Sequence, residues 1–171
     1  NTAIVASQIV QSIADVRLAF ERFKLSRGLS AEEVVFCDAD GSRCDTLGSF
    51  ADLCSTGANC LFSPEGGGAS INLPQGYALW IYDERAFSSI SNVGTAADDI
   101  YLNVFGDWGV QDMPLEMCDA INKGFGQITE ETIGGDWGSG LSVDGSYDFC
   151  IDTHAHPTIT NYQYFSVLSA F

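Results

Sequence analysis

The first 27 residues carry one apolar stripe along an otherwise polar segment. Apolar residues recur there in steps of three or four, which places them on one face of an α-helix. The segment from Thr2 to Arg27 has neither Gly nor Pro, and Gly28 is typical of the position that follows a helix. The pattern therefore predicts a helix over residues 1–27. Its packing face comprises Val5, Ile9, Ile13, Val16, Phe20 and Phe23.

A helix of this length reaches about 39 Å at about 1.5 Å per residue, which exceeds the span of one small domain. It opens on Asn1 without a capping residue or a preceding turn. We therefore expect a helix whose earlier part is missing. In that arrangement Phe20 and Phe23 lie nearest a globular head and pack on its sheet, whereas Val5 and Ile9 lie near a projecting end.

The rest of the chain alternates between turn-rich stretches and strand-like runs. Residues 28–76 are rich in Gly and Asp and predict turns with short regular pieces at best. Strands are predicted over 77–82, 100–105, 147–151 and 162–171, where β-branched and aromatic residues gather. Residues 100–105 alternate apolar with mixed positions, as a half-buried strand does.

A second helix is predicted from Pro114 to Lys123, since Pro is tolerated at the first helical position and Gly124 follows as a stop. Leu115, Cys118 and Ile121 recur at helical spacing, which directs Cys118 toward the core. No regular crossover helices separate the strands, so the fold class is α+β, with a long helix and an antiparallel sheet.

Composition limits both the number of domains and the kinds of partner that the chain can have. With 171 residues, 46% of them hydrophobic, the chain can bury one core, which predicts a single domain over 1–171. The net charge of -16 argues against nucleic acid and anionic membrane surfaces as partners. No apolar run approaches the roughly 20 residues that span a bilayer, so we expect a soluble chain.

Six cysteines, an even number, indicate an oxidising compartment and three disulfides. No C-x-x-C spacing occurs, so zinc and thioredoxin-type chemistry lack their usual geometry. We therefore expect an extracytoplasmic protein.

Two segments suggest metal chemistry. Asp152, His154 and His156 match a D-x-H-x-H pattern, and in a strand they would share a face. That pattern belongs near the start of a barrel of about 250 residues, whereas here only 15 residues follow His156, so a loop is favoured. Residues 37–45 set carboxylates around a Gly turn, but the EF-hand register fails, and a small disulfide loop is favoured.

No nucleophile elbow, P-loop or dinucleotide fingerprint is present. The 23 acidic residues make proximity of two carboxylates weak evidence for a glycosidase. Trp108 and Trp137 could stack on sugars, although tryptophan is at least as often a packing residue. We therefore expect no enzyme activity, no cofactor and no metal.

Four features follow one another in a familiar order. They are IADVRLAF with GLSAEEVV (13–20 and 28–35), SPEGGGASINL (63–73), YLNVFG with MPLEMCDAI (101–106 and 113–121), and Cys150 with the C-terminal strand. In this order the chain resembles the type IV pilins, particularly the type IVb class of toxin-coregulated pilin and conjugative thin-pilus pilins. It departs from them in lacking the apolar N-terminal half-helix and in having four additional cysteines.

The resemblance implies a pilin-like head. Residues 1–27 would be the C-terminal half of the spine helix, 28–76 a disulfide-containing loop region, and 77–171 the sheet with its disulfide-bounded region. Cys118 and Cys150 would be the family's disulfide pair. For the other four cysteines we expect Cys37–Cys44 and Cys54–Cys60, with the nested pairing Cys37–Cys60 and Cys44–Cys54 left open.

The function implied is that of a structural subunit of an extracellular pilus. Its partners would be other pilin subunits and the pilus assembly machinery, and it would be anchored in the inner membrane before assembly, through the missing helix only. The stripe from Val5 to Phe23 would serve as the packing and assembly face. Two alternatives are a minor pilin or tip adhesin that binds a glycan or host surface and, more remotely, a metal-dependent hydrolase.

Overall fold

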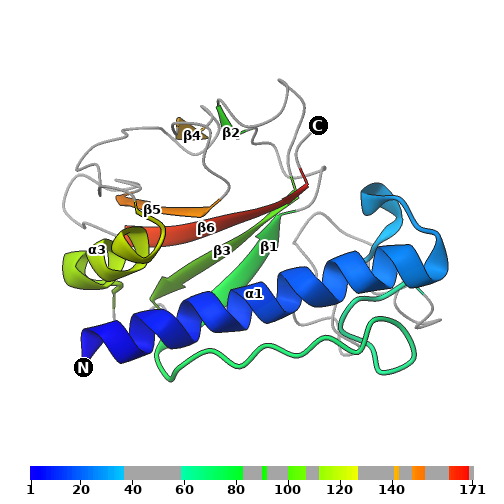
Figure 1. The fold of residues 1–171 in the computed structure, drawn as a ribbon, viewed down its shortest axis with the longest axis horizontal. Coiled ribbons are helices and arrows are strands. Elements are labelled where there is room, and N and C mark those ends of the chain that lie inside the picture. The colour runs from blue at the N-terminus through cyan, green and yellow to red at the C-terminus, as the bar shows by residue number, and fades with distance from the viewer. Residues whose placement is uncertain are drawn as a thin grey trace. The chain divides into compact units, whose positions relative to one another are not determined.

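The computed structural model describes residues 1–36, 59–82, 90–91, 100–106, 112–126, 141–142, 148–152 and 162–169. The chain divides into two compact units, Asn1–Gln11 with Leu73–Phe171 and, separately, Ser12–Asn72. Helix α1 (Thr2–Arg27) contributes residues to each unit and is continuous (Figure 1). The expectation of a single domain remains a prediction.

The first unit contains a four-stranded antiparallel sheet in the order β1-β3-β6-β5 (Figure 1). The strands are β1 (Tyr77–Tyr82), β3 (Ile100–Gly106), β5 (Asp148–Asp152) and β6 (Tyr162–Ser169). A separate parallel pair joins β2 (Ile90–Ser91) to β4 (Leu141–Ser142). The predicted α+β class is confirmed, and the four predicted strands are present within two residues of their expected bounds.

Strand β3 corrects one expectation, because it is buried along its whole length and not half-buried. Leu102 and Asn103 point to opposite faces of the sheet, and they are 0% and 1% exposed. The physical reason is position: β3 lies between β1 and β6, and both faces of the sheet are covered there. An alternating sequence shows which residue types lie on each face of a strand, but it does not show whether either face is exposed to solvent.

One face of the sheet is built from aromatic rings around a pair of amides. Phe165 stacks on Phe149 with ring centroids 5.3 Å apart and lies 5.8 Å from the ring of Tyr101. In the same layer Asn103 Nδ2 donates a hydrogen bond of 3.0 Å to Gln163 Oε1. The two amides lie on neighbouring strands in a diagonal arrangement that long side chains can bridge. A buried polar pair of this kind favours one strand register, because slippage would leave both amides unpaired.

Helix α3 (Leu115–Gly124) lies against β5 and β6 (Figure 1). Pro114 is its N-cap and not its first helical residue, a shift of one position. Cys118 and Ile121 are buried as predicted, but Leu115 is 39% exposed. The buried face runs through Met117, Cys118, Ile121 and Asn122. Leu115 lies at about a quarter turn from the centre of that face, because each residue advances about 100° around the helix.

The second unit begins within α1 and ends at Asn72. Helix α1 stops where expected: Gly28 has φ 66°, and the N–H of Leu29 donates to the carbonyl of Lys24 at 3.0 Å. This is the Schellman arrangement, which satisfies a terminal carbonyl and favours Gly at the left-handed position. A short 3-10 helix, η1 (Ala31–Glu33), follows and is opened by a capping box between Ser30 and Glu33.

The remaining described part of this unit is a compact loop. Val35 forms a parallel bridge with Cys60, and the chain then turns back on itself through three glycines. A Cβ placed on Gly67 would lie 2.6 Å from the carbonyl oxygen of Leu61, which is too close for any other residue without rearrangement. The N–H of Asn72 donates to the hydroxyl of Ser12 at 3.1 Å, which ties the end of the loop to α1.

Candidate functional site

The apolar stripe of α1 is the first feature to which the sequence assigns a role. Its members Ile9, Ile13, Val16, Phe20 and Phe23 are buried, whereas Val5 is only partly buried. Ile9 is 0% exposed, so the expectation that it belongs to a projecting end is wrong. The reason is that Asn1–Gln11 form part of a compact unit with the segment from Leu73 onward.

Phe20 illustrates how the stripe is packed within the second unit. Its ring is fully buried and stacks on Phe36, with centroids 5.6 Å apart. The ammonium of Lys24 lies 4.5 Å from the same ring and is also paired with Glu21 at 2.9 Å. A cation over an aromatic face is attracted by the negative charge of that face. These contacts lie within Ser12–Asn72, so they neither confirm nor contradict the expected packing of Phe20 on the sheet.

The opposite side of α1 carries apolar side chains that the stripe did not predict. Leu25 is 83% exposed, Leu18 is 48% exposed, and Ile4, near the start of the helix, is 56% exposed. Leu18 and Leu25 are seven residues apart, a spacing that returns to nearly the same face after two turns. That spacing is visible in the sequence, but only the exposure of these side chains in the structure distinguishes them from the buried packing stripe.

Helix α1 is also long and apolar enough to cross a membrane, by length and composition alone. This property was not expected from the sequence, because polar residues interrupt the apolar runs of the helix. In the structure 33% of its most apolar stretch is buried, and the core helix of a soluble protein can be equally long and apolar. An N-terminal helix of this kind and a disulfide are weakly compatible with a secreted or membrane-anchored protein.

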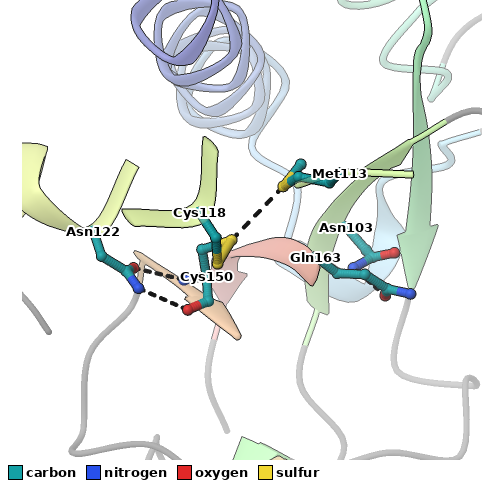
Figure 2. The surroundings of a disulfide bond; sticks show 6 residues. All are labelled: Asn103, Met113, Cys118, Asn122, Cys150 and Gln163. Carbon is teal, nitrogen blue, oxygen red and sulfur yellow. Dashed lines mark hydrogen bonds between the residues drawn. A yellow bond between two sulfur atoms is a disulfide. The ribbon is translucent and has the colours of Figure 1, made fainter. Parts of the chain in front are cut away.

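The disulfide between Cys118 and Cys150 is present, as predicted. It joins α3 to β5 with a Cα–Cα distance of 5.3 Å, and both residues are 0% exposed. The thioether sulfur of Met113 lies 3.7 Å from the sulfur of Cys150 (Figure 2). This is a packing contact, because a disulfide sulfur has no proton to donate.

Cys60 is buried, and it is the only other cysteine within the described residues. Cys37, Cys44 and Cys54 lie outside them, so the sequential and nested pairings of these four cysteines both remain predictions.

The side chain of Asn122 holds the main chain of Cys150 (Figure 2). Asn122 Nδ2 donates to the carbonyl oxygen of Cys150 at 2.7 Å, and the N–H of Cys150 donates to Asn122 Oδ1 at 2.8 Å. Asn122 is 2% exposed, so both bonds are shielded from water. Neither the spacing nor the residue type marks Asn122 in the sequence, because its partner lies 28 residues away.

The groups that suggested chemistry fall mostly beyond the described residues. Asp152 is the last residue of β5, whereas His154, His156, Trp108, Trp137 and residues 37–45 lie outside. Within the described ranges no group of three or more His, Cys, Asp or Glu residues is placed to hold a metal ion. Among the described carboxylates, that of Glu33 has a lowered pKa. The main cause is a hydrogen bond from the backbone N–H of Ser30, and a second hydrogen bond from the Ser30 hydroxyl contributes less. Glu33 is exposed and belongs to the capping box, so its pKa reflects helix capping.

Comparison with protein-family models, with curated proteins and with solved structures finds no match.

Proposed function

We propose that this chain is the head of a type IV pilin-like protein, a non-enzymatic structural subunit of an extracellular filament. The observation that carries the proposal is the order of its parts. A 26-residue N-terminal helix precedes an antiparallel sheet, and a disulfide ties the short helix α3 to β5. The sequence resemblance to type IVb pilins rests on the same order.

The surface of α1 supports the proposal in a second way. A helix that served only to cover a core would place polar residues on its outer side, because exposed leucine gains nothing from water. Leu18 and Leu25 are instead exposed at a seven-residue spacing. This spacing suits the side-by-side packing of long helices, in which apolar residues recur about every 3.5 positions. We assign these two leucines to contacts between subunits and the buried stripe to contacts within the subunit.

The proposed partners are other copies of the chain and the machinery that assembles them. The subunit would be held in the inner membrane before assembly and would act outside the cell afterwards, where disulfides persist. The net charge of -16 would keep isolated heads apart at low salt, so assembly would depend on helix contacts.

The proposal is tested in cells that produce the protein, with an antibody raised against the purified chain. We expect the antibody to label surface filaments in electron micrographs. We also expect the double variant Leu18→Lys, Leu25→Lys to abolish the filaments, because burying two lysines between helices is unfavourable. Gln75→Lys adds the same kind of charge at an exposed loop position and should leave filaments intact.

Circular dichroism of the purified variants shows whether the head remains folded. Absence of labelled filaments in the unaltered strain, or filaments that persist in the double lysine variant with normal yield, would contradict the proposal. The upstream codons provide an independent test: we expect a leader followed by about 25 apolar residues, enough to cross a bilayer.

A further inference from the structure

Two residues of α3 hold the same residue of β5. Cys118 is bonded to the sulfur of Cys150, and Asn122 bonds to the N–H and the carbonyl oxygen of Cys150 at 2.8 and 2.7 Å (Figure 2). Residues 118 and 122 are one helical turn apart, so they lie on the same side of α3. All three residues are buried. A helix that is held by Asn122 therefore presents Cys118 to Cys150.

The hydrogen bonds of Asn122 do not require the disulfide. Their partners are main-chain atoms of Cys150, which are the same in the thiol and in the disulfide form. An asparagine side chain donates through its NH2 group and accepts through its carbonyl oxygen at the same time. With this geometry the Cα atoms of Cys118 and Cys150 lie 5.3 Å apart. That distance falls in the range of about 4.4 to 6.8 Å that a disulfide requires.

Side chains at both ends of α3 add contacts that are also noncovalent. Phe125, the C-cap of α3, stacks on Tyr164 of β6 with ring centroids 6.1 Å apart. Met113 precedes the helix, and its sulfur lies 3.7 Å from the sulfur of Cys150 (Figure 2). Hydrogen bonds and packing thus define the docked position of α3 without the covalent bond.

Sequence distance alone gives Cys118 little preference for Cys150. The two residues are 32 positions apart, and Cys60, the nearest preceding cysteine, is less than twice as far from Cys118. The entropic cost of closing a loop grows only with the logarithm of its length, so this difference favours Cys150 by less than about threefold. The six cysteines of the chain allow many other pairings. Selection of this pair therefore depends on a contact that brings α3 to β5.

We propose that Asn122 is a positioning residue for disulfide formation. In the reduced chain it docks α3 on β5, so that Cys118 is oxidised together with Cys150 and not with another of the six cysteines. The two thiols are the reacting groups, and Asn122 acts on them only through the main chain of Cys150. This role does not depend on the filament proposal, which concerns α1.

The oxidation is a thiol–disulfide exchange with a small disulfide such as oxidised glutathione. The thiolate of one cysteine attacks the reagent, which forms a mixed disulfide and releases one glutathione. The thiolate of the other cysteine then attacks the mixed disulfide, so that the Cys118–Cys150 bond forms and the second glutathione leaves. The protein loses two electrons and two protons, and the two glutathione thiols gain them.

Asn122 acts at the second of these steps. Both cysteines are 0% exposed in the folded protein, so the first attack precedes the docking of α3. The second attack is intramolecular, and its rate depends on the fraction of chains in which α3 lies against β5. The hydrogen bonds of Asn122 increase that fraction.

The proposal is tested by refolding the reduced full chain in a glutathione buffer, with samples quenched in acid and mapped as peptides by mass spectrometry. In Asn122→Ala the Cys118–Cys150 disulfide should form about tenfold more slowly, the factor that corresponds to one buried hydrogen bond. Cys118 should also appear in pairs with other cysteines. Asn72→Ala removes an exposed asparagine from the other unit and should refold like the unaltered chain. An unchanged rate, or slower formation without any other pairing of Cys118, would overturn the proposal.

Asn122→Leu separates hydrogen bonding from side-chain shape. Leucine is close to asparagine in shape and is a better helix former, but it offers neither donor nor acceptor. It should therefore slow the Cys118–Cys150 disulfide as much as Asn122→Ala does. A normal rate in Asn122→Leu would show that packing and not hydrogen bonding positions the thiols, and it would contradict the proposal.

A variant without this disulfide tests whether the Asn122 hydrogen bonds form independently of it. In Cys118→Ala, Cys150→Ala the main-chain N–H at position 150 should stay protected from hydrogen exchange, as measured by NMR. Adding Asn122→Ala should make this N–H exchange about tenfold faster, whereas the N–H of Leu102 in the central strand β3 should keep its rate. An unprotected N–H at position 150 in the double variant, or equal acceleration at Leu102, would refute the proposal. The presence or absence of filaments has no bearing on these outcomes.

Discussion

Phe20→Ala is the most informative single change within α1, because the Phe20 ring makes several contacts within the second unit. The ring is fully buried, stacks on Phe36 at 5.6 Å and lies 4.5 Å from the ammonium of Lys24. Truncation of a buried Phe to Ala typically costs about 3 to 5 kcal/mol through lost burial and the cavity that remains. The aromatic pair accounts for about 0.5 to 1.5 kcal/mol of such a loss. The ammonium contact is worth about 0.5 kcal/mol.

We therefore expect a decrease of about 4 kcal/mol in the free energy of unfolding, within the range for a truncated buried Phe. For a chain of this size that corresponds to a fall in melting temperature of about 8 to 16 °C. Urea titration and thermal melts of the oxidised protein, followed by circular dichroism, measure both quantities. The difference should appear in the urea midpoint and not in the slope, because the surface exposed on unfolding is nearly unchanged.

Leu18→Ala is the matched control, two residues earlier on the same helix but 48% exposed. Leucine and alanine are both good helix formers, so the control should lower stability by less than about 1 kcal/mol. Equal losses for Phe20→Ala and Leu18→Ala would refute the division of α1 into a buried face and an outer face. The assignment of Leu18 to contacts between subunits would then fail as well.

Three further outcomes follow from the described contacts. Peptide mapping of the non-reduced protein should recover Cys118 bonded to Cys150, and Cys118→Ala with Cys150→Ala should lower stability by about 3.7 kcal/mol, the chain-entropy value for this loop. NMR titration should place the pKa of Glu33 below 4.5, and Ser30→Ala should raise this pKa. Because the folded pKa is depressed, the hydrogen bonds to the Glu33 carboxylate stabilise the fold above about pH 4.5. This stabilisation is lost as the pH falls through the folded pKa. Gly67→Ala should destabilise the loop by about 1 to 3 kcal/mol, because its Cβ would collide with a backbone carbonyl; a wild-type urea midpoint would contradict this.

The elements themselves were largely readable from the sequence, because each depends on neighbours a few residues away. The spacing of the apolar stripe and the position of Gly28 predicted α1, and in the structure the helix ends at Arg27. Strand β1 has the bounds that its residue types predicted. The disulfide was expected from the family resemblance and is present. Of the six stripe residues, Val5 is the exception to full burial, as is common near the end of a helix.

Tertiary structure decided which surfaces meet, because that depends on residues far apart in the chain. No local pattern orders the strands β1-β3-β6-β5 or buries both faces of β3. The amide pair of Asn103 and Gln163 forms between residues 60 positions apart. Asn122 reaches the edge of β5 only because α3 lies against that strand. Sequence periodicity specifies which side chains share a face, whereas burial and hydrogen bonding depend on what that face is packed against.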